Sequence, residues 1–282
     1  MRGTDHRLVT RFQRRLLAWY GKHGRDLPWR RTRHPYRILV SEIMLQQTQV
    51  DRVIPKYREF LRRYPTLRRL AAADVSEVRQ VWYPLGYNAR PVRLHAIARE
   101  TLARYGGRLP DDRGALRRLP GIGRYTASAM LSFAFGRDAA LIDTNVRRVL
   151  GRVFLGPRRA KRMRGENAWW QLAETLVPAG RAYDFNQALM DFGATWCTPR
   201  RPRCPSCPMK PICATYPALA PASRPSRRAR ERTGWPRSAT ALPGASAHPT
   251  GASAHPTGAS AHPPGALRAR GAWGGIDSPP MI

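Results

Sequence analysis

The sequence predicts an all-α fold with about ten helices. Apolar residues recur at helical spacing through most of the chain up to Pro217. No segment shows a convincing strand pattern. With 282 residues, 42% of them hydrophobic, the chain can bury one large core or two modest cores.

The first half of the chain reads as a series of helices with two distinctive loops. A Pro-broken loop carries Arg25, Trp29 and Arg30, and a second loop at 82–87 holds three aromatic residues. The long apolar run at 38–50 contains one acid, Glu42. Apolar spacing predicts helices over 5–21, 50–64, 67–73, 75–81 and 92–105, the last ended by two glycines.

A short glycine hairpin lies between two further helical segments. Pro120, Gly121, Ile122 and Gly123 form a tight turn whose backbone N–H groups point outward. Free N–H groups at the start of a helix can bind phosphate. Downstream, Asp143 precedes another apolar-periodic run and occupies an N-cap position. Two more helices are predicted over 169–177 and 185–196.

The charge balance indicates a polyanionic partner. The chain has 50 Lys and Arg against 18 Asp and Glu, of which only 8 and 2 lie after Pro217, so the part of the chain up to Pro217 carries a net charge of +26. Nucleic acid is the favoured partner and an acidic membrane surface the second option. Because no apolar run approaches the ~20 residues of a membrane span and no signal peptide is evident, we expect an intracellular, cytoplasmic protein.

All four cysteines occur in one short stretch of the chain, as Cys197, Cys204, Cys207 and Cys213. With no cysteine elsewhere, a disulfide framework is not expected. Four thiolates on a short loop suit either zinc or an iron–sulfur cluster. Because only one C-x2-C unit is present, the spacing favours the cluster.

Glu42 and Asp143 are candidates for paired acid and carboxylate chemistry. A carboxyl group in apolar surroundings has a raised pKa, whereas a carboxylate at a helix start stays ionised. One protonated acid and one fixed carboxylate can cleave a glycosidic bond. The alternatives are an exposed Glu42 on a partly buried helix and an Asp143 that only caps its helix.

The last segment, 218–282, contains the repeat GASAHPT, GASAHPT, GASAHPP and is rich in Ala, Gly, Pro and Ser. Such a composition has little to bury, and we expect a disordered tail.

Five motifs in order resemble the helix-hairpin-helix DNA glycosylases that carry an iron–sulfur loop, as in the endonuclease III type. The motifs are SEIMLQQTQV at 41–50, LGYNAR at 85–90, LPGIGRYTA at 119–127, DTNVRRVL at 143–150 and the cysteine loop at 197–213. This resemblance covers residues 8–216. It implies two lobes, a six-helix lobe at 28–135 with the hairpin and a second lobe from 1–27 and 136–217, with a 4Fe-4S cluster on the four cysteines.

The resemblance also implies roles for individual residues. Glu42 resembles the general acid that protonates adenine at N7, Asp143 the carboxylate that stabilises the sugar cation, and Asn145 a residue that supports the site. Tyr125 stands where bifunctional relatives carry a lysine. Without that amine no Schiff base forms, and we expect a monofunctional enzyme without lyase activity.

Further residues resemble the family's contacts to mismatched double-stranded DNA, which a monomer would bind. Leu45, Gln46 and Gln47 would line the base pocket and fill the gap left by the flipped base, and Tyr87 would wedge into the stack. The pocket rim would hold Arg25, Trp29 and Arg30. Phosphate contacts would come from Pro120, Gly121, Ile122, Gly123, Arg200, Arg201 and Arg203.

The resemblance leaves two possible substrate bases, adenine and thymine. The motifs are most similar to adenine glycosylases, which act opposite 8-oxoguanine or guanine, but 176–193 resembles thymine–guanine mismatch glycosylases about equally well. The tail also stands where the adenine branch carries a domain that reads the opposite base. In the aromatic loop, Pro84 and Asn88 stand where the resembled family more commonly has Gly and Tyr. A DNA-binding protein without catalysis is the third alternative.

Overall fold

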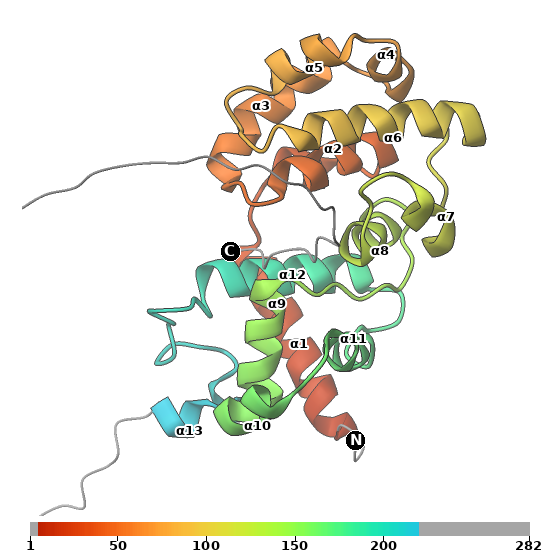
Figure 1. The fold of residues 1–282 in the computed structure, drawn as a ribbon. Coiled ribbons are helices and arrows are strands. Elements are labelled where there is room, and N and C mark those ends of the chain that lie inside the picture. Colours follow the sequence, from red (N-terminus) through yellow and green to blue (C-terminus); the bar gives the residue numbers. More distant parts are fainter. Residues whose placement is uncertain (1–4, 220–282) are drawn as a thin grey trace, which may run out of the picture. The chain divides into compact units, whose positions relative to one another are not determined.

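The computed structural model describes residues 5–219, which belong to one unit of the chain. Every regular element in this range is helical, which confirms the predicted all-α class (Figure 1). The repeat-bearing part of the predicted tail lies outside the described residues. Within the described range, no helix combines the length and apolar character that a membrane span requires.

The first hydrophobic core is built from residues between Leu27 and Leu141. Its helices are α2 (Pro35–Leu45), α3 (Val50–Arg63), α4 (Leu67–Ala71), α5 (Val75–Trp82), α6 (Ala89–Tyr105), α7 (Arg113–Arg118) and α8 (Arg124–Phe133), preceded by a 3-10 turn at Pro28–Arg31. This range holds seven α-helices rather than the six expected. The short helices predicted over 67–73 and 75–81 are present as α4 and α5, each with its own side-chain N-cap, Thr66 and Asp74.

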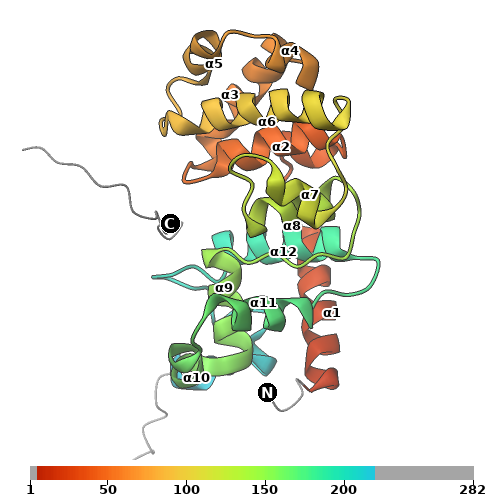
Figure 2. The same ribbon diagram turned by 45° about the vertical axis from the view of Figure 1, so that its right-hand side comes forward.

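Helix α2 lies at the centre of this core. It contacts α3, α6 and α8, and eight of its eleven residues are buried (Figures 1 and 2). A helix that is apolar on nearly all sides is expected to be enclosed in this way. Glu42 is therefore buried because the apolar residues on either side of it in α2 are buried.

The second core combines the N-terminal helix with the C-terminal part of the described chain. Its elements are α1 (His6–His23), α9 (Thr144–Leu150), a π-helical turn (Gly151–Leu155), α10 (Gly156–Arg162), α11 (Glu166–Glu174), α12 (Ala182–Thr195) and a 3-10 turn (Lys210–Ile212). The short helix α13 (Tyr216–Leu219) follows them. Helix α1 packs against α12, although the two lie at opposite ends of the described sequence (Figure 2). Edge-on aromatic contacts join Phe12 to Phe185 and Trp19 to Phe192, with ring centroids 6.1 and 5.0 Å apart.

The glycine hairpin between α7 and α8 has the geometry expected of a tight turn. Gly121 has φ +76°, in the left-handed region that glycine adopts without strain. The Ile122 N–H donates to the Leu119 carbonyl at 3.2 Å, which closes the turn, and Gly123 begins α8 as its N-cap. The hairpin places the start of α8, including Tyr125, beside α2.

Candidate active site

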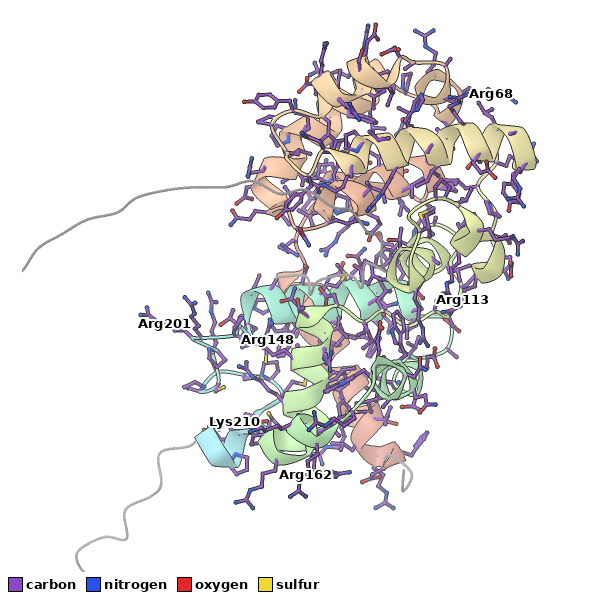
Figure 3. The ribbon with its side chains drawn as sticks, in the orientation of Figure 1. Arg68, Arg113, Arg148, Arg162, Arg201 and Lys210 are labelled. Atoms are coloured by element: carbon purple, nitrogen blue, oxygen red, sulfur yellow. The ribbon has the colours of Figure 1, made fainter. Side chains whose placement is uncertain are left out.

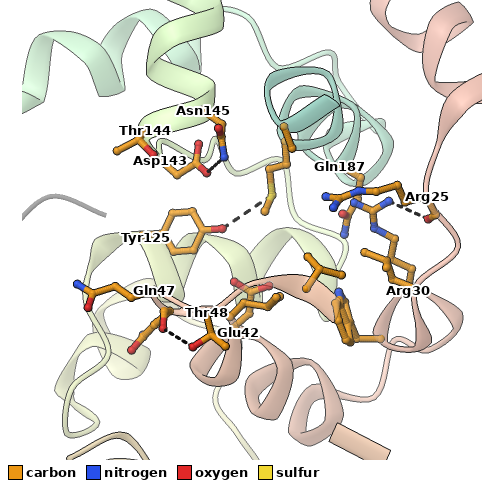
Figure 4. A pocket seen from close by; sticks show the side chains of 17 residues that line it. Arg25, Arg30, Glu42, Gln47, Thr48, Tyr125, Asp143, Thr144, Asn145 and Gln187 are labelled. Carbon is orange, nitrogen blue, oxygen red and sulfur yellow. Dashed lines mark hydrogen bonds between the residues drawn. The ribbon is translucent and has the colours of Figure 1, made fainter. Parts of the chain in front are cut away.

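The predicted acid and carboxylate line one cavity of about 190 Å³ (Figure 4). Side chains from α2, α8, α9, α12 and the loop after α1 meet there. The polar lining residues are Arg25, Arg30, Glu42, Gln46, Gln47, Thr48, Tyr125, Asp143, Thr144, Asn145 and Gln187. Pockets for drug-sized ligands have volumes of about 300–1,000 Å³, so this cavity suits a smaller group such as one heterocyclic base.

Glu42 is 6% exposed, so it is not an acid on the outer side of its helix. Burial raises its pKa to about 7, and the negative charge of Asp143 adds to the rise. Arg30 and the Tyr125 hydroxyl oppose this shift but do not cancel it. Glu42 can therefore hold a proton near neutral pH, as the apolar run around it predicted.

Asp143 is the N-cap of α9. Its carboxylate accepts hydrogen bonds from the Val146 N–H at 2.6 Å and from the Asn145 side-chain amide at 3.2 Å. Burial raises the pKa of Asp143 above its usual value, and these hydrogen bonds and the nearby Arg148 offset only part of that rise. The sequence prediction considered only the helix end, and burial is the opposing factor that the structure adds.

Asn145 also links Asp143 to the cysteine loop. The Arg148 guanidinium donates to the Asn145 side-chain oxygen at 2.7 Å and to the Cys197 carbonyl at 2.8 Å. A continuous series of hydrogen bonds thus runs from the first cysteine to the carboxylate. Arg148 and Asn145 thus connect Asp143 to the cysteine loop.

Tyr125 projects from the first turn of α8 toward the centre of the cavity (Figure 4). Its hydroxyl lies 3.8 Å from the Met190 sulfur. Burial raises the pKa of Tyr125 well above its usual value, so the phenol stays neutral. Of the four lysines of the chain, none lines this cavity.

Arg25, Trp29 and Arg30 line the cavity, and the two arginines are held in place by a residue that the sequence did not point to. Asp191 of α12 is fully buried and accepts hydrogen bonds from the Arg25 Nε and the Arg30 Nη1, both at 2.7 Å. These arginines hold the pKa of Asp191 below its usual value although burial opposes this. Gln187, also missed, lies one turn earlier on α12 and lines the cavity. Two polar residues four positions apart in an apolar helix were the available signal.

The predicted DNA contacts divide into two groups. Leu45, Gln46 and Gln47 line the cavity. Tyr87, the glycine hairpin and the arginines of the cysteine loop do not. Tyr87 is 58% exposed, and Arg200, Arg201 and Arg203 are exposed on the cysteine loop, from which Arg201 projects (Figure 3). Both Gln47 and Tyr87 have positive φ, near 54° and 52°.

The four cysteines are half-buried free thiols. Burial raises the pKa of Cys204, Cys207 and Cys213, and the charges of neighbouring cysteines add to the rise. No three His, Cys, Asp or Glu side chains among residues 5–219 are arranged to bind a single metal ion. The Met209 N–H and Arg152 lie 3.4 and 3.5 Å from the Cys207 and Cys197 sulfurs. Four soft donors with N–H groups directed at the sulfurs suit an iron–sulfur cluster.

Comparison with known proteins shows the family to which the chain belongs. A family model described as "HhH-GPD superfamily base excision DNA repair protein" matches residues 40–174. The chain is 42% identical over 245 residues to an adenine DNA glycosylase of Rattus norvegicus, covering 84% of this chain and 45% of that protein. It is 40% identical over 202 residues to a thymine/uracil-DNA glycosylase of Methanothermobacter thermautotrophicus, covering 71% and 91% of the two.

The structure of a thermostable thymine-DNA glycosylase is similar to this fold, with a TM-score of 0.72 and 38% identity. That match covers 77% of this chain and all of the other. The chain therefore spans less than half of the rat protein but nearly all of the Methanothermobacter protein.

Proposed function

Since the chain belongs to the HhH-GPD superfamily of base excision DNA repair proteins, we propose that it is a DNA N-glycosylase that releases adenine paired with 8-oxoguanine or guanine. One observation carries the proposal. A buried acid with a pKa of about 7 and a helix-capping carboxylate line the same base-sized cavity. This pairing supplies a proton to a leaving base and a negative charge to the sugar cation.

The proton-transfer step favours a purine. Glu42 donates its proton to N7 of adenine, the bond between the sugar C1′ and N9 breaks, and its electron pair leaves with the neutral base. Asp143 stabilises the resulting cation at C1′ until water adds there and gives its proton to the Glu42 carboxylate, which restores the acid. Thymine has no N7, so an acid at this position assists its departure less directly.

We also propose that the enzyme is monofunctional. Strand cleavage through a Schiff base needs an amine at the sugar. Tyr125 occupies the cavity, and no lysine lines it. Treatment with borohydride during the reaction should therefore yield no covalent protein–DNA adduct, whereas an adduct would show that a lysine from elsewhere reaches the sugar.

The second candidate is release of thymine or uracil opposite guanine. It is supported by the Methanothermobacter relative, which aligns along nearly its whole length, and by the thymine-DNA glycosylase structure. The adenine glycosylase of the rat, in contrast, is more than twice as long as the matched region.

A panel of mismatched duplexes separates the two candidates. Single-turnover base release should be fastest for adenine opposite 8-oxoguanine or guanine and absent with Glu42→Gln. Release of thymine alone from a thymine–guanine pair would overturn the adenine assignment and favour the second candidate. Failure of both duplexes to react would leave a DNA-binding protein without catalysis.

We further propose that Cys197, Cys204, Cys207 and Cys213 hold a 4Fe-4S cluster. When bound, the cluster would cross-link the loop that carries three exposed arginines and to which Arg148 is anchored. Its proposed role is structural, because none of the four cysteines lines the cavity.

A further inference from the structure

Arg90 makes an unusual set of contacts for a buried cation. Its side chain lies at the start of α6, and the residue is 4% exposed. No carboxylate pairs with it among the described ion pairs, and its guanidinium donates only to backbone carbonyls. The acceptors are Ile43 at 3.3 Å, Met44 at 2.8 Å and Gln46 at 2.5 Å for Nη1, and Leu85 and Gly86, both at 3.1 Å, for Nη2.

The positive charge of Arg90 is favourable for the neighbouring helix α2 and unfavourable for its own helix α6. A cation in the first turn of α6 opposes that helix's dipole. The same cation lies at the C-terminal end of α2, where free carbonyls carry partial negative charge and the last turn has no basic residue. Burial lowers the pKa of Arg90 to about 10, so the guanidinium remains charged at neutral pH.

The two loops that Arg90 joins are the ones that carry Gln47 and Tyr87. These are the only residues other than glycine with positive φ in the described part of the chain. Each directly follows a carbonyl that Arg90 holds, because Gln46 precedes Gln47 and Gly86 precedes Tyr87. One planar guanidinium thus fixes the peptide group in front of both strained residues. The exposed Tyr87 ring also lies 5.1 Å from the Arg90 guanidinium.

We propose that Arg90 is a positioning residue that locks the Gln47 turn and the Tyr87 loop to each other, so that both side chains enter the DNA stack as one unit. This inference rests on the proposed function, since it assumes that a base leaves the duplex. Base extrusion needs side chains that occupy the vacated space. A fixed spacing between two such side chains lets the entry of one assist the other.

The test measures extrusion without base release. The full chain with Glu42→Gln is mixed with adenine–guanine and thymine–guanine duplexes that carry 2-aminopurine next to the mismatch, whose fluorescence rises when neighbouring bases unstack. Arg90→Lys keeps the charge, but a single ammonium cannot span both loops. It should lower the extrusion equilibrium at least fivefold. The control Arg99→Lys, at an exposed position on α6, should leave it unchanged.

A positioning role makes the effects of the two inserted side chains interdependent. In the chain with Arg90, the combined loss from Gln47→Ala and Tyr87→Ala should be well below the product of the single losses. In the Arg90→Lys background each alanine substitution should cost less than twofold. Equal losses in both backgrounds, or multiplicative losses with Arg90 present, would overturn the proposal.

The two alanine substitutions in the chain with Arg90 intact can overturn the proposal even if Arg90→Lys unfolds the protein, because multiplicative losses there would show that the two side chains act independently. The readout also separates the two proposals. If neither base is released by the unaltered chain but the losses remain interdependent, only the proposed catalytic function fails.

Discussion

At the scale of single residues, the cavity holds two carboxyl groups in different surroundings. Glu42 projects from the buried helix α2 and lacks backbone donors, whereas Asp143 receives N–H groups from its own helix start. The negative charge of Asp143 therefore raises the pKa of Glu42 further. Burial raises both pKa values, but only Asp143 receives N–H groups from its own helix start that oppose the rise, which assigns Glu42 the role of acid and Asp143 that of carboxylate.

This difference predicts the pH dependence of base release. Glu42 is the proton donor below its pKa of about 7 and loses that proton as the pH rises. The kcat/KM of base release should therefore be nearly constant below about pH 6 and fall about tenfold per pH unit above about pH 8. Rates measured between pH 5.5 and 9 test this. A profile that stays flat to pH 9 would contradict the role of Glu42.

Asp191 offers a second prediction at this scale. Asp191→Asn removes the only carboxylate that pairs with Arg25 and Arg30 in the described part of the chain, and the Arg30 side chain is 8% exposed. Leaving a buried charge without its partner costs about 3–5 kcal/mol, measured as the free energy of unfolding in urea at pH 7. Because the native pKa of Asp191 is lowered, the difference should shrink as acid protonates the unaltered chain.

The matched control is Glu77→Gln, which breaks an exposed ion pair with Arg63. Exposed pairs contribute little, so this change should be nearly neutral. Equal losses for the two variants would show that Asp191 does not compensate the buried arginines.

At the scale of elements, the glycine hairpin can be tested at two neighbouring positions. Gly121→Ala forces a side chain into positive φ and brings Cβ to 2.9 Å from Cδ of Arg93. It should cost about 1–2 kcal/mol of unfolding free energy and weaken DNA binding. Gly123→Ala meets no heavy atom within 4 Å and keeps a negative φ, so it should cost clearly less. The reverse order in urea unfolding would contradict this account of the turn.

The cysteine loop is predicted to carry iron. Protein purified without air should be brown and contain about four iron atoms per chain, the content of the proposed cluster type. Stoichiometric zinc would instead show a single-ion site, for which the described side chains have no suitable arrangement. Iron analysis and the visible absorption spectrum provide the measurements.

At the scale of the whole molecule, the sequence predicted the helical class and the burial of Glu42, because both follow from local apolar spacing. Asp191 and Arg90 could not be found in this way. Their partners lie far away along the chain, as Arg25 does from Asp191 and Met44 from Arg90, and only the packing of helices brings them together. Arg25 and Arg30, which the sequence predicts at the pocket rim, are also the counter-ions of Asp191.

The charge of the molecule predicts strongly salt-dependent DNA binding. Basic residues cover both helical parts of the described chain, and Arg201 and Lys210 lie on or beside the cysteine loop (Figure 3). Each phosphate contact contributes a slope of about −0.9 to a plot of log affinity against log salt. Replacing Arg200, Arg201 and Arg203 together by Gln should therefore reduce the slope by up to about three.

The matched control is Arg62→Gln, at an exposed position on α3 of the other core. It lowers the net charge but removes no proposed phosphate contact, so the slope should be unchanged. Glu42→Gln should bind with the slope of the unaltered chain, because Glu42 is enclosed in the cavity rather than directed at the backbone of the DNA. If Arg62→Gln and the cysteine-loop variant reduce the slope equally per charge, diffuse attraction by the net charge accounts for binding, and the cysteine loop has no specific phosphate-binding role.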